Sequence, residues 1–175
     1  MDNKKWWFAL IAIVLLLGQV DARVFASDDS EPGSTTLEGI RNIYVRVAMD
    51  PEIETKGLGA DQLKKDTEQQ LREAGIKILT EGDFSRLKGS VRYPLAGLDV
   101  IITLIEIQEM ELDIYDIEVK IRQVVFLARR PVIKIFAPTW KDQTVFQSNS
   151  LGLIREKLKE SVDKFLNAYL SVNPK

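Results

Sequence analysis

Residues 98–107 read LDVIITLIEI, a nearly continuous apolar run in which Asp99, Thr103 and Glu106 are interspersed. A near-continuous apolar run of this kind is typical of a central strand. We therefore expect residues 98–107 to form a central strand of a β-sheet, and the rest of the fold is built outward from it.

Two further strands are predicted downstream. From Ile117 toward Leu127, apolar residues alternate with charged ones, which predicts a half-exposed strand. Residues 132–137 form a third apolar stretch, bracketed by Pro131 and Pro138. Because proline cannot donate a ladder hydrogen bond, this strand is expected at an edge of the sheet or beside a bulge. The three strands together predict an antiparallel meander.

Upstream, the pattern predicts a β-α-β unit. In residues 42–49, apolar and polar side chains alternate as they do in a strand. Residues 60–74 carry an apolar stripe at helical spacing, and Gly75 follows at the position after a helix where a left-handed backbone conformation is common. Residues 76–79 read as a second short strand. Two strands joined by one helix are expected to be parallel.

The C-terminal segment, residues 149–170, predicts a second helix, because its apolar residues recur at three- and four-residue steps. Residues 80–97 form a long connection with one expected helical turn at 84–87, and a connection of this length is typical of a functional or mobile loop. The fold class is therefore α+β: one mixed sheet of about five strands, in the order β-α-β-β-β-α, with two helices on one face.

The N-terminus predicts export. Lys4 and Lys5 precede an apolar run of thirteen residues, and Ala22 follows at a position suited to signal cleavage, with Ala26 as an alternative site. A membrane-spanning helix needs about 20 apolar residues, so an uncleaved anchor is the weaker interpretation. We expect a signal peptide at 1–22, a flexible polar leader at 23–38 and a single α+β domain at 39–175.

Composition excludes several classes of function. The 175-residue chain contains no cysteine and no histidine, which removes Ser-His-Asp and Cys-His catalysis, ordinary zinc sites and lipid attachment to cysteine. A net charge of −2 gives no field that would attract a nucleic acid. We expect no cofactor and no metal. Because a secreted eukaryotic domain of this size usually has disulfides, we expect this chain in the bacterial periplasm.

Two local features remain weak as functional signals. The segment Gly57-Leu58-Gly59 precedes a predicted helix but lacks the spacing of a dinucleotide fingerprint, and we interpret it as a turn. Six carboxylates crowd residues 106–118 without the spacing of a calcium loop, which favours a solvated hairpin. The carboxylates are Glu106, Glu109, Glu111, Asp113, Asp116 and Glu118.

The candidate binding residues are Trp140, Phe136, Lys134 and Arg130. Trp140 is the only tryptophan after residue 7, and the segment around it combines aromatic and cationic side chains on a predicted edge strand. Such a combination is suited to anchoring a partner. Burial of Trp140 in the core is the alternative, since tryptophan is highly buried on average.

The element order resembles that of the N-terminal α+β domain of the TolB family of periplasmic translocation proteins. The resemblance lies in residues 43–47, in the helix that runs into 71–78 (LREAGIKI), and in the meander and terminal helix. The tail, residues 154–174, is similar to that of uncharacterised exported proteins of Gram-negative bacteria. We expect no β-propeller after this domain, in contrast to the TolB family. The resemblance implies an interaction module without catalysis.

The leading hypothesis is thus a non-catalytic periplasmic module for interaction or envelope assembly, whose edge strand accepts another envelope protein. Membrane contact is expected only through the signal peptide before its cleavage. An alternative is a protein that binds a small ligand or lipid on the uncovered sheet face, with the 80–97 loop as a flap. A third is a hydrolase that acts through the acidic hairpin.

Overall fold

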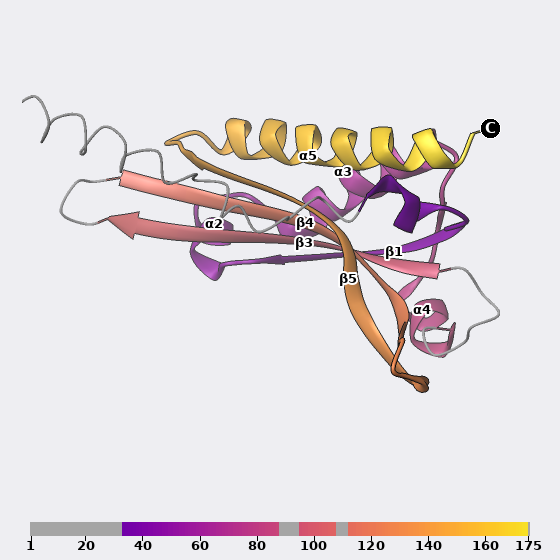
Figure 1. Ribbon diagram of the computed structural model, residues 1–175. Coiled ribbons are helices and arrows are strands. Elements are labelled where there is room, and N and C mark those ends of the chain that lie inside the picture. Colours follow the sequence, from indigo (N-terminus) through magenta and orange to yellow (C-terminus); the bar gives the residue numbers. More distant parts are fainter. Residues whose placement is uncertain (1–32, 88–94, 108–111, 175) are drawn as a thin grey trace, which may run out of the picture. The chain divides into compact units, whose positions relative to one another are not determined.

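The computed structural model describes residues 33–87, 95–107 and 112–174, with the side chains of Ile107 and Leu112 excepted (Figure 1). The predicted signal peptide, most of the predicted leader, and Glu109 and Glu111 of the acidic stretch lie outside these residues.

The described chain forms one five-stranded mixed sheet with the strand order β2-β1-β3-β4-β5. Strand β1 is parallel to both β2 and β3, whereas β3, β4 and β5 form an antiparallel meander. The predicted mixed sheet, the parallel β-α-β unit and the meander are confirmed. The strands are β1 (Asn42–Met49), β2 (Lys77–Ile78), β3 (Leu95–Ile107), β4 (Leu112–Leu127) and β5 (Arg130–Gln147).

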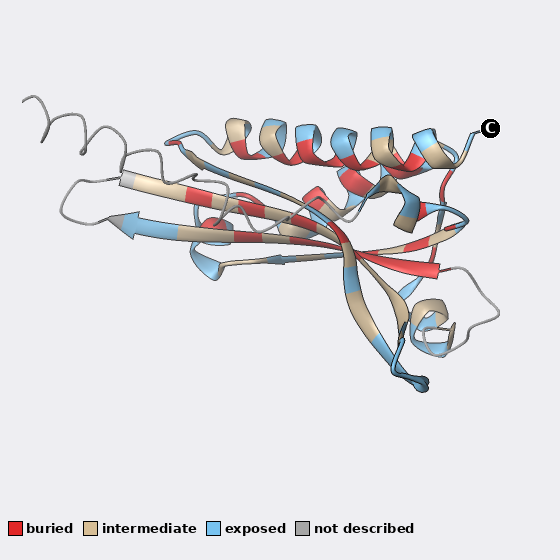
Figure 2. Ribbon diagram, viewed as in Figure 1, coloured by how far each residue is buried: buried red, intermediate tan, exposed pale blue. Residues whose placement is uncertain are grey.

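Two helices, α3 (Ala60–Glu73) and α5 (Leu151–Val172), pack on one face of the sheet, as predicted (Figure 1). Helix α5 turns its buried side toward the strands (Figure 2). The core between the sheet and these two helices contains alternate residues of the central strands and apolar residues of both helices. It includes Ile43, Val45, Leu98, Val100, Ile117, Val119, Leu63, Leu71, Leu158, Val162 and Phe165.

The strands of the meander are longer than predicted. Strand β5 passes through Pro138 and continues to Gln147, where the sequence pattern predicted an end at Ala137. Ile121 of β4 pairs with Trp140, and the next residue pairs with Pro138, so Thr139 is an extra residue of β5 at a register shift. The predicted edge position and the predicted bulge are therefore both present. The proline lies at the edge, where no further strand needs its missing donor.

A shorter helix, α4 (Glu81–Leu87), lies against the opposite face of the sheet, which we call the second face. The sequence predicted only one helical turn here. Phe84 of α4 stacks on Tyr44 of β1 at 4.8 Å between ring centroids and meets Phe136 of β5 at 5.7 Å. These aromatic contacts hold α4 to the sheet. A five-residue helix, α2 (Pro51–Thr55), follows β1.

The segment before β1 is a 3-10 helix, η2 (Ser34–Leu37), within the stretch predicted to be a flexible leader. Leu37 is fully buried, and its carbonyl accepts a 3.0 Å hydrogen bond from Nδ2 of Asn173 at the end of α5. Thr36 Oγ1 donates to the carbonyl of Thr139 at 2.9 Å. The packed part of the chain therefore includes residues 34–37.

Candidate functional site

The second face carries the polar side chains of the central strands. Successive residues of a strand point to opposite faces. Because Ile43 and Val45 of β1 are buried in the core, Tyr44 between them and Arg46 after them face the other side. The same alternation brings residues of β3, β4 and β5 to this face, namely Gly97, Asp99, Arg122, Val124 and Phe136.

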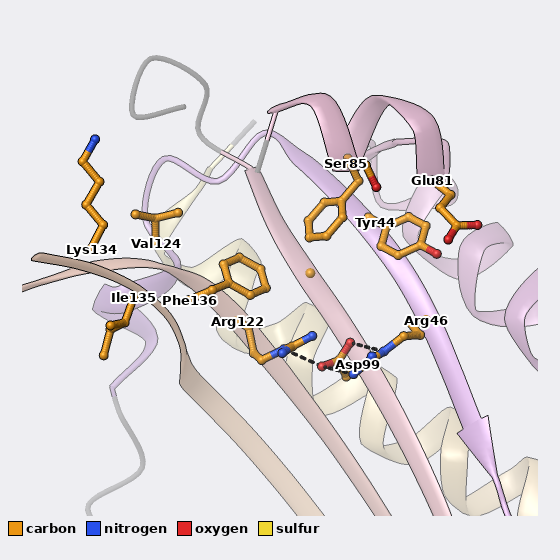
Figure 3. A pocket seen from close by; sticks show the side chains of 12 residues that line it. Tyr44, Arg46, Glu81, Ser85, Asp99, Arg122, Val124, Lys134, Ile135 and Phe136 are labelled. Atoms are coloured by element: carbon orange, nitrogen blue, oxygen red, sulfur yellow. Dashed lines mark hydrogen bonds and ion pairs between the residues drawn. The ribbon is translucent and has the colours of Figure 1, made fainter. Parts of the chain in front are cut away.

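Asp99 forms an ion cluster with two arginines on this face (Figure 3). Arg46 stands directly opposite Asp99 in the β1–β3 pairing, and its Nε and Nη2 donate to Oδ1 at 3.0 Å and to Oδ2 at 3.1 Å. Arg122 approaches from β4, with its Nε 2.6 Å from Oδ2 but not aligned for a hydrogen bond. The Asp99 side chain is only 3% exposed, whereas Arg46 is 50% and Arg122 28% exposed. A buried carboxylate of this kind needs cationic partners, and the Asp99 carboxylate in turn holds both guanidinium groups in place.

Aromatic rings border the ion cluster. The guanidinium of Arg122 lies 4.9 Å from the centroid of the Phe136 ring, a cation–π contact. Gly97 is the residue of β3 that lies against both rings: a Cβ at this position would stand 3.3 Å from Phe136 and 3.5 Å from Phe84. The missing side chain lets both rings approach the backbone of β3.

These groups enclose a pocket of about 480 Å³ between α4 and the second face (Figure 3). Its size is in the usual range of small-ligand pockets. The ion cluster lies on the strands, and α4 contributes Glu81, Phe84 and Ser85. Lys134 and Ile135 of β5 complete the lining.

Of the four binding residues predicted from the sequence, the structure brings two together. Phe136 and Lys134 both line the pocket. Arg130 is exposed at the start of β5 and is not among the lining residues. Trp140 is 3% exposed and packs edge-on against Phe165 of α5 at 5.5 Å, so the core interpretation describes its position.

Sequence reasoning missed Arg46, Asp99, Arg122 and Phe84. Arg46 and Asp99 are 53 residues apart, and only the parallel pairing of β1 with β3 makes them neighbours. One signal was available: Asp99 interrupts an apolar stretch predicted to be a central strand, and a buried carboxylate requires a cationic partner. The sequence did not indicate which cation it would be.

A second feature is the outer half of the β4–β5 hairpin, residues 123–137, which we call the arm. The pairing of β3 with β4 ends at Arg122, so beyond it β4 pairs only with β5. The arm extends away from α5 and is largely exposed (Figures 1 and 2). Its apolar side chains include Val132 at 87% exposure and Phe126 at 49%.

The described carboxylates of residues 106–118 are paired with neighbours. Lys56 Nζ lies 2.6 Å from Asp113 and 3.4 Å from Glu106, and the hydrogen bond to Asp113 is the largest cause that raises the pKa of Lys56. Asp116 accepts hydrogen bonds from Gln143. Within the described ranges, no group of three or more potential ligand side chains is placed to hold a metal ion. None of the helices in the described part of the chain has the length and apolarity needed to cross a membrane.

The chain matches no protein-family model, and a search of curated proteins gives no match. Among solved structures, it is similar to a PelC dodecamer from Paraburkholderia phytofirmans, with a TM-score of 0.41 and 10% identity over 75% of this chain and 87% of that chain. A variant PelC dodecamer from the same organism gives a TM-score of 0.39 and 10% identity over 75% and 89%. These values describe a distant structural similarity, and the resemblance to the TolB family stays a prediction.

Proposed function

We propose that this chain is a non-catalytic binding module of the bacterial cell envelope that docks onto a partner protein through the arm. The observation that carries the proposal is the set of apolar side chains that the arm exposes on a two-stranded ribbon outside the core. The location in the periplasm rests on the export signal predicted from the sequence.

The arm is a two-stranded part of the sheet, and the described part of the chain places no third strand beside it. A two-stranded ribbon is marginally stable in water unless a third strand or a helix covers it. Val132, Ile133, Ile135 and Phe126 are all exposed by more than a third. Apolar side chains that gather exposed on one segment mark interaction surfaces. Strand β5 is also the edge of the sheet, and an edge strand offers unpaired backbone groups to an incoming strand.

Charge defines the kind of partner. Residues 119–141 contain six basic and no acidic residues, although the whole chain has a net charge of −2. Within the arm, Arg129, Arg130 and Lys134 flank the apolar residues. We therefore propose that the partner contributes an extended segment that is both acidic and apolar and pairs with the part of β5 that lies in the arm, because complementary charge favours encounter and fixes register.

Site-specific photo-crosslinking in the native envelope tests the proposal. A crosslinking amino acid at Val132 should capture one dominant protein, and mass spectrometry should locate the crosslink in an acidic segment of it. The matched control is Val145, which is 60% exposed on the inner half of the same strand and should give no such product.

The double substitution Val132→Asp/Ile133→Asp should abolish capture by a crosslinker placed at Phe126, whereas Val145→Asp should not. Equal capture at positions 132 and 145 would contradict the proposal, and so would capture of lipid or of a second copy of this chain in place of a different protein.

The pocket beneath α4 favours a second candidate function, binding of a small ligand on the second face. Its volume, its aromatic walls and its arginines are the supporting observations. We do not propose hydrolysis, because the described carboxylates of the acidic stretch are engaged by Lys56, Lys120 and Gln143.

A further inference from the structure

We infer that the pocket between α4 and the second face binds a small ligand in which a flat or puckered ring carries one carboxylate group. The inference rests on the second candidate function. The pocket shares Val124, Lys134, Ile135 and Phe136 with the arm, and its test measures ligand binding directly, without the partner protein.

The arginines supply the anion-binding part. A guanidinium has five N–H donors in a planar fork. The hydrogen bonds to Asp99 engage Nε and Nη2 of Arg46, and Arg122 directs only its Nε at the same carboxylate. Among the described residues, no further hydrogen bond engages the remaining donors of either guanidinium group, so they can bind a ligand, and Asp99 holds them in one orientation. Preorganised donors of this kind bind a carboxylate with little loss of side-chain entropy.

The net charge of the pocket lining favours a ligand with a single negative charge. The described lining contains three cationic side chains, Arg46, Arg122 and Lys134, and two carboxylates, Asp99 and Glu81, which gives it one net positive charge. One carboxylate on the ligand neutralises this charge. A phosphate near neutral pH carries up to two negative charges and would leave one uncompensated beside Glu81 and Asp99.

The aromatic side chains supply the ring-binding part. Phe84 and Phe136 meet edge to face at 5.7 Å, and Phe84 stacks on Tyr44. Arg122 lies over Phe136, so the anion donors stand next to the aromatic wall. A ligand whose ring contacts Phe136 can therefore place a carboxylate on that ring within reach of Arg122. The volume of about 480 Å³ holds one such ring with its substituents.

Two sources of ligand share this chemistry: an aromatic carboxylate and an acidic sugar. Glu81 and Ser85 of α4 line the same pocket and offer hydrogen bonds that a hydroxylated ring would use. The two sources are distinguished by titrating the isotope-labelled protein with benzoate and with glucuronate, followed by amide chemical shifts. Benzamide and glucose serve as the neutral counterparts.

We expect saturable shifts at Gly97, Asp99 and Phe136 with one of the two carboxylates, and binding at least about tenfold weaker for its neutral counterpart. Saturation by benzoate alone assigns the aromatic source, and saturation by glucuronate alone assigns the sugar. Absence of saturable shifts with both carboxylates would overturn the inference, as would equal binding of the neutral compounds.

The variant Arg122→Lys tests the role of the fork. It keeps a positive charge beside Asp99, so the fold is expected to persist, and it removes the planar donors. The affinity for the bound carboxylate should fall about tenfold. The control Arg155→Lys on α5 should bind as the unaltered protein does. Unchanged affinity in folded Arg122→Lys, with folding checked by thermal unfolding, would contradict the inference.

Discussion

The two halves of the β4–β5 hairpin are built from the same alternation of side chains, but the apolar side chains are buried in one half and exposed in the other. In the inner half, Tyr115, Ile117, Val119, Ile121 and Trp140 are buried. In the arm, Phe126, Val132, Ile133 and Ile135 are exposed. The inner half is flanked by β3 and covered by α5, whereas the pairing with β3 ends at Arg122.

The difference shows that burial in a hairpin is decided by its neighbours. An alternating strand supplies an apolar face, but only a third strand and a helix remove that face from water. Where the neighbours end, the apolar residues remain exposed, and their burial free energy, about 1.5–3 kcal/mol for a fully buried side chain, is left for a partner to supply.

The substitution Phe165→Ala should destabilise the inner half most strongly. Phe165 is fully buried on α5 and contacts both Trp140 and Tyr169. Loss of a buried phenylalanine ring costs about 3–5 kcal/mol of unfolding free energy. Urea unfolding followed by Trp140 fluorescence measures the change.

The matching substitution in the arm, Val132→Ala, should change the unfolding free energy by no more than about 0.5 kcal/mol, because the side chain is already exposed. A comparable loss in both variants would show that the arm is packed as tightly as the core, and the contrast would fail.

Leu37→Ala should have the next largest effect. The helix η2 contacts the hairpin near the bulge, where the inner half meets the arm: Gln123 Nε2 donates to the Thr36 carbonyl at 2.8 Å and to Thr139 Oγ1 at 2.7 Å. Since Leu37 is fully buried, its truncation should cost about 2–5 kcal/mol, seen as a lower Tm. The exposed neighbour Thr35→Ala is the control. An unchanged Tm would instead favour the flexible leader predicted at 23–38.

Tyr169→Phe should have a smaller effect than the two core truncations, and one that depends on pH. The Tyr169 hydroxyl donates to the Ile40 carbonyl at 2.8 Å, and burial raises the pKa of Tyr169, as it raises that of Tyr115. Near pH 7 the loss of one hydrogen bond should cost about 1 kcal/mol.

A raised tyrosine pKa means that the folded protein holds the proton more tightly than the unfolded chain does. The stabilisation is thus fully present below pH 10, the ordinary pKa of tyrosine, and is lost as the pH rises above it. Unfolding free energies measured between pH 7 and 11 should fall less steeply in Tyr169→Phe than in the unaltered protein. Parallel curves would rule out this contribution.

The sequence predicted what depends on local pattern. The alternation in 42–49, the helical stripes and the apolar run at 98–107 each correspond to an observed element, because hydrophobic period reflects which face is buried. The end of β5 was wrong, since Pro138 was interpreted as a stop although an edge strand tolerates it.

The candidate site was predicted only in part, for a different reason. Phe136 and Lys134 stand close together in the chain and were found as an aromatic residue among cations. Arg46 reaches Asp99 because β1, which is distant in the sequence, pairs with β3, and Arg122 joins them from the following strand β4. No local pattern carries that information.

The parallel pairing of β1 with β3 has a consequence for the order of folding. The meander forms between strands that follow one another in the chain, whereas Arg46 and Asp99 come together only after a loop of about fifty residues has closed. Distant pairings slow folding, so we expect the hairpin to form early and β1 to join late. The arm would then be available to a partner while the first strand is still joining the sheet.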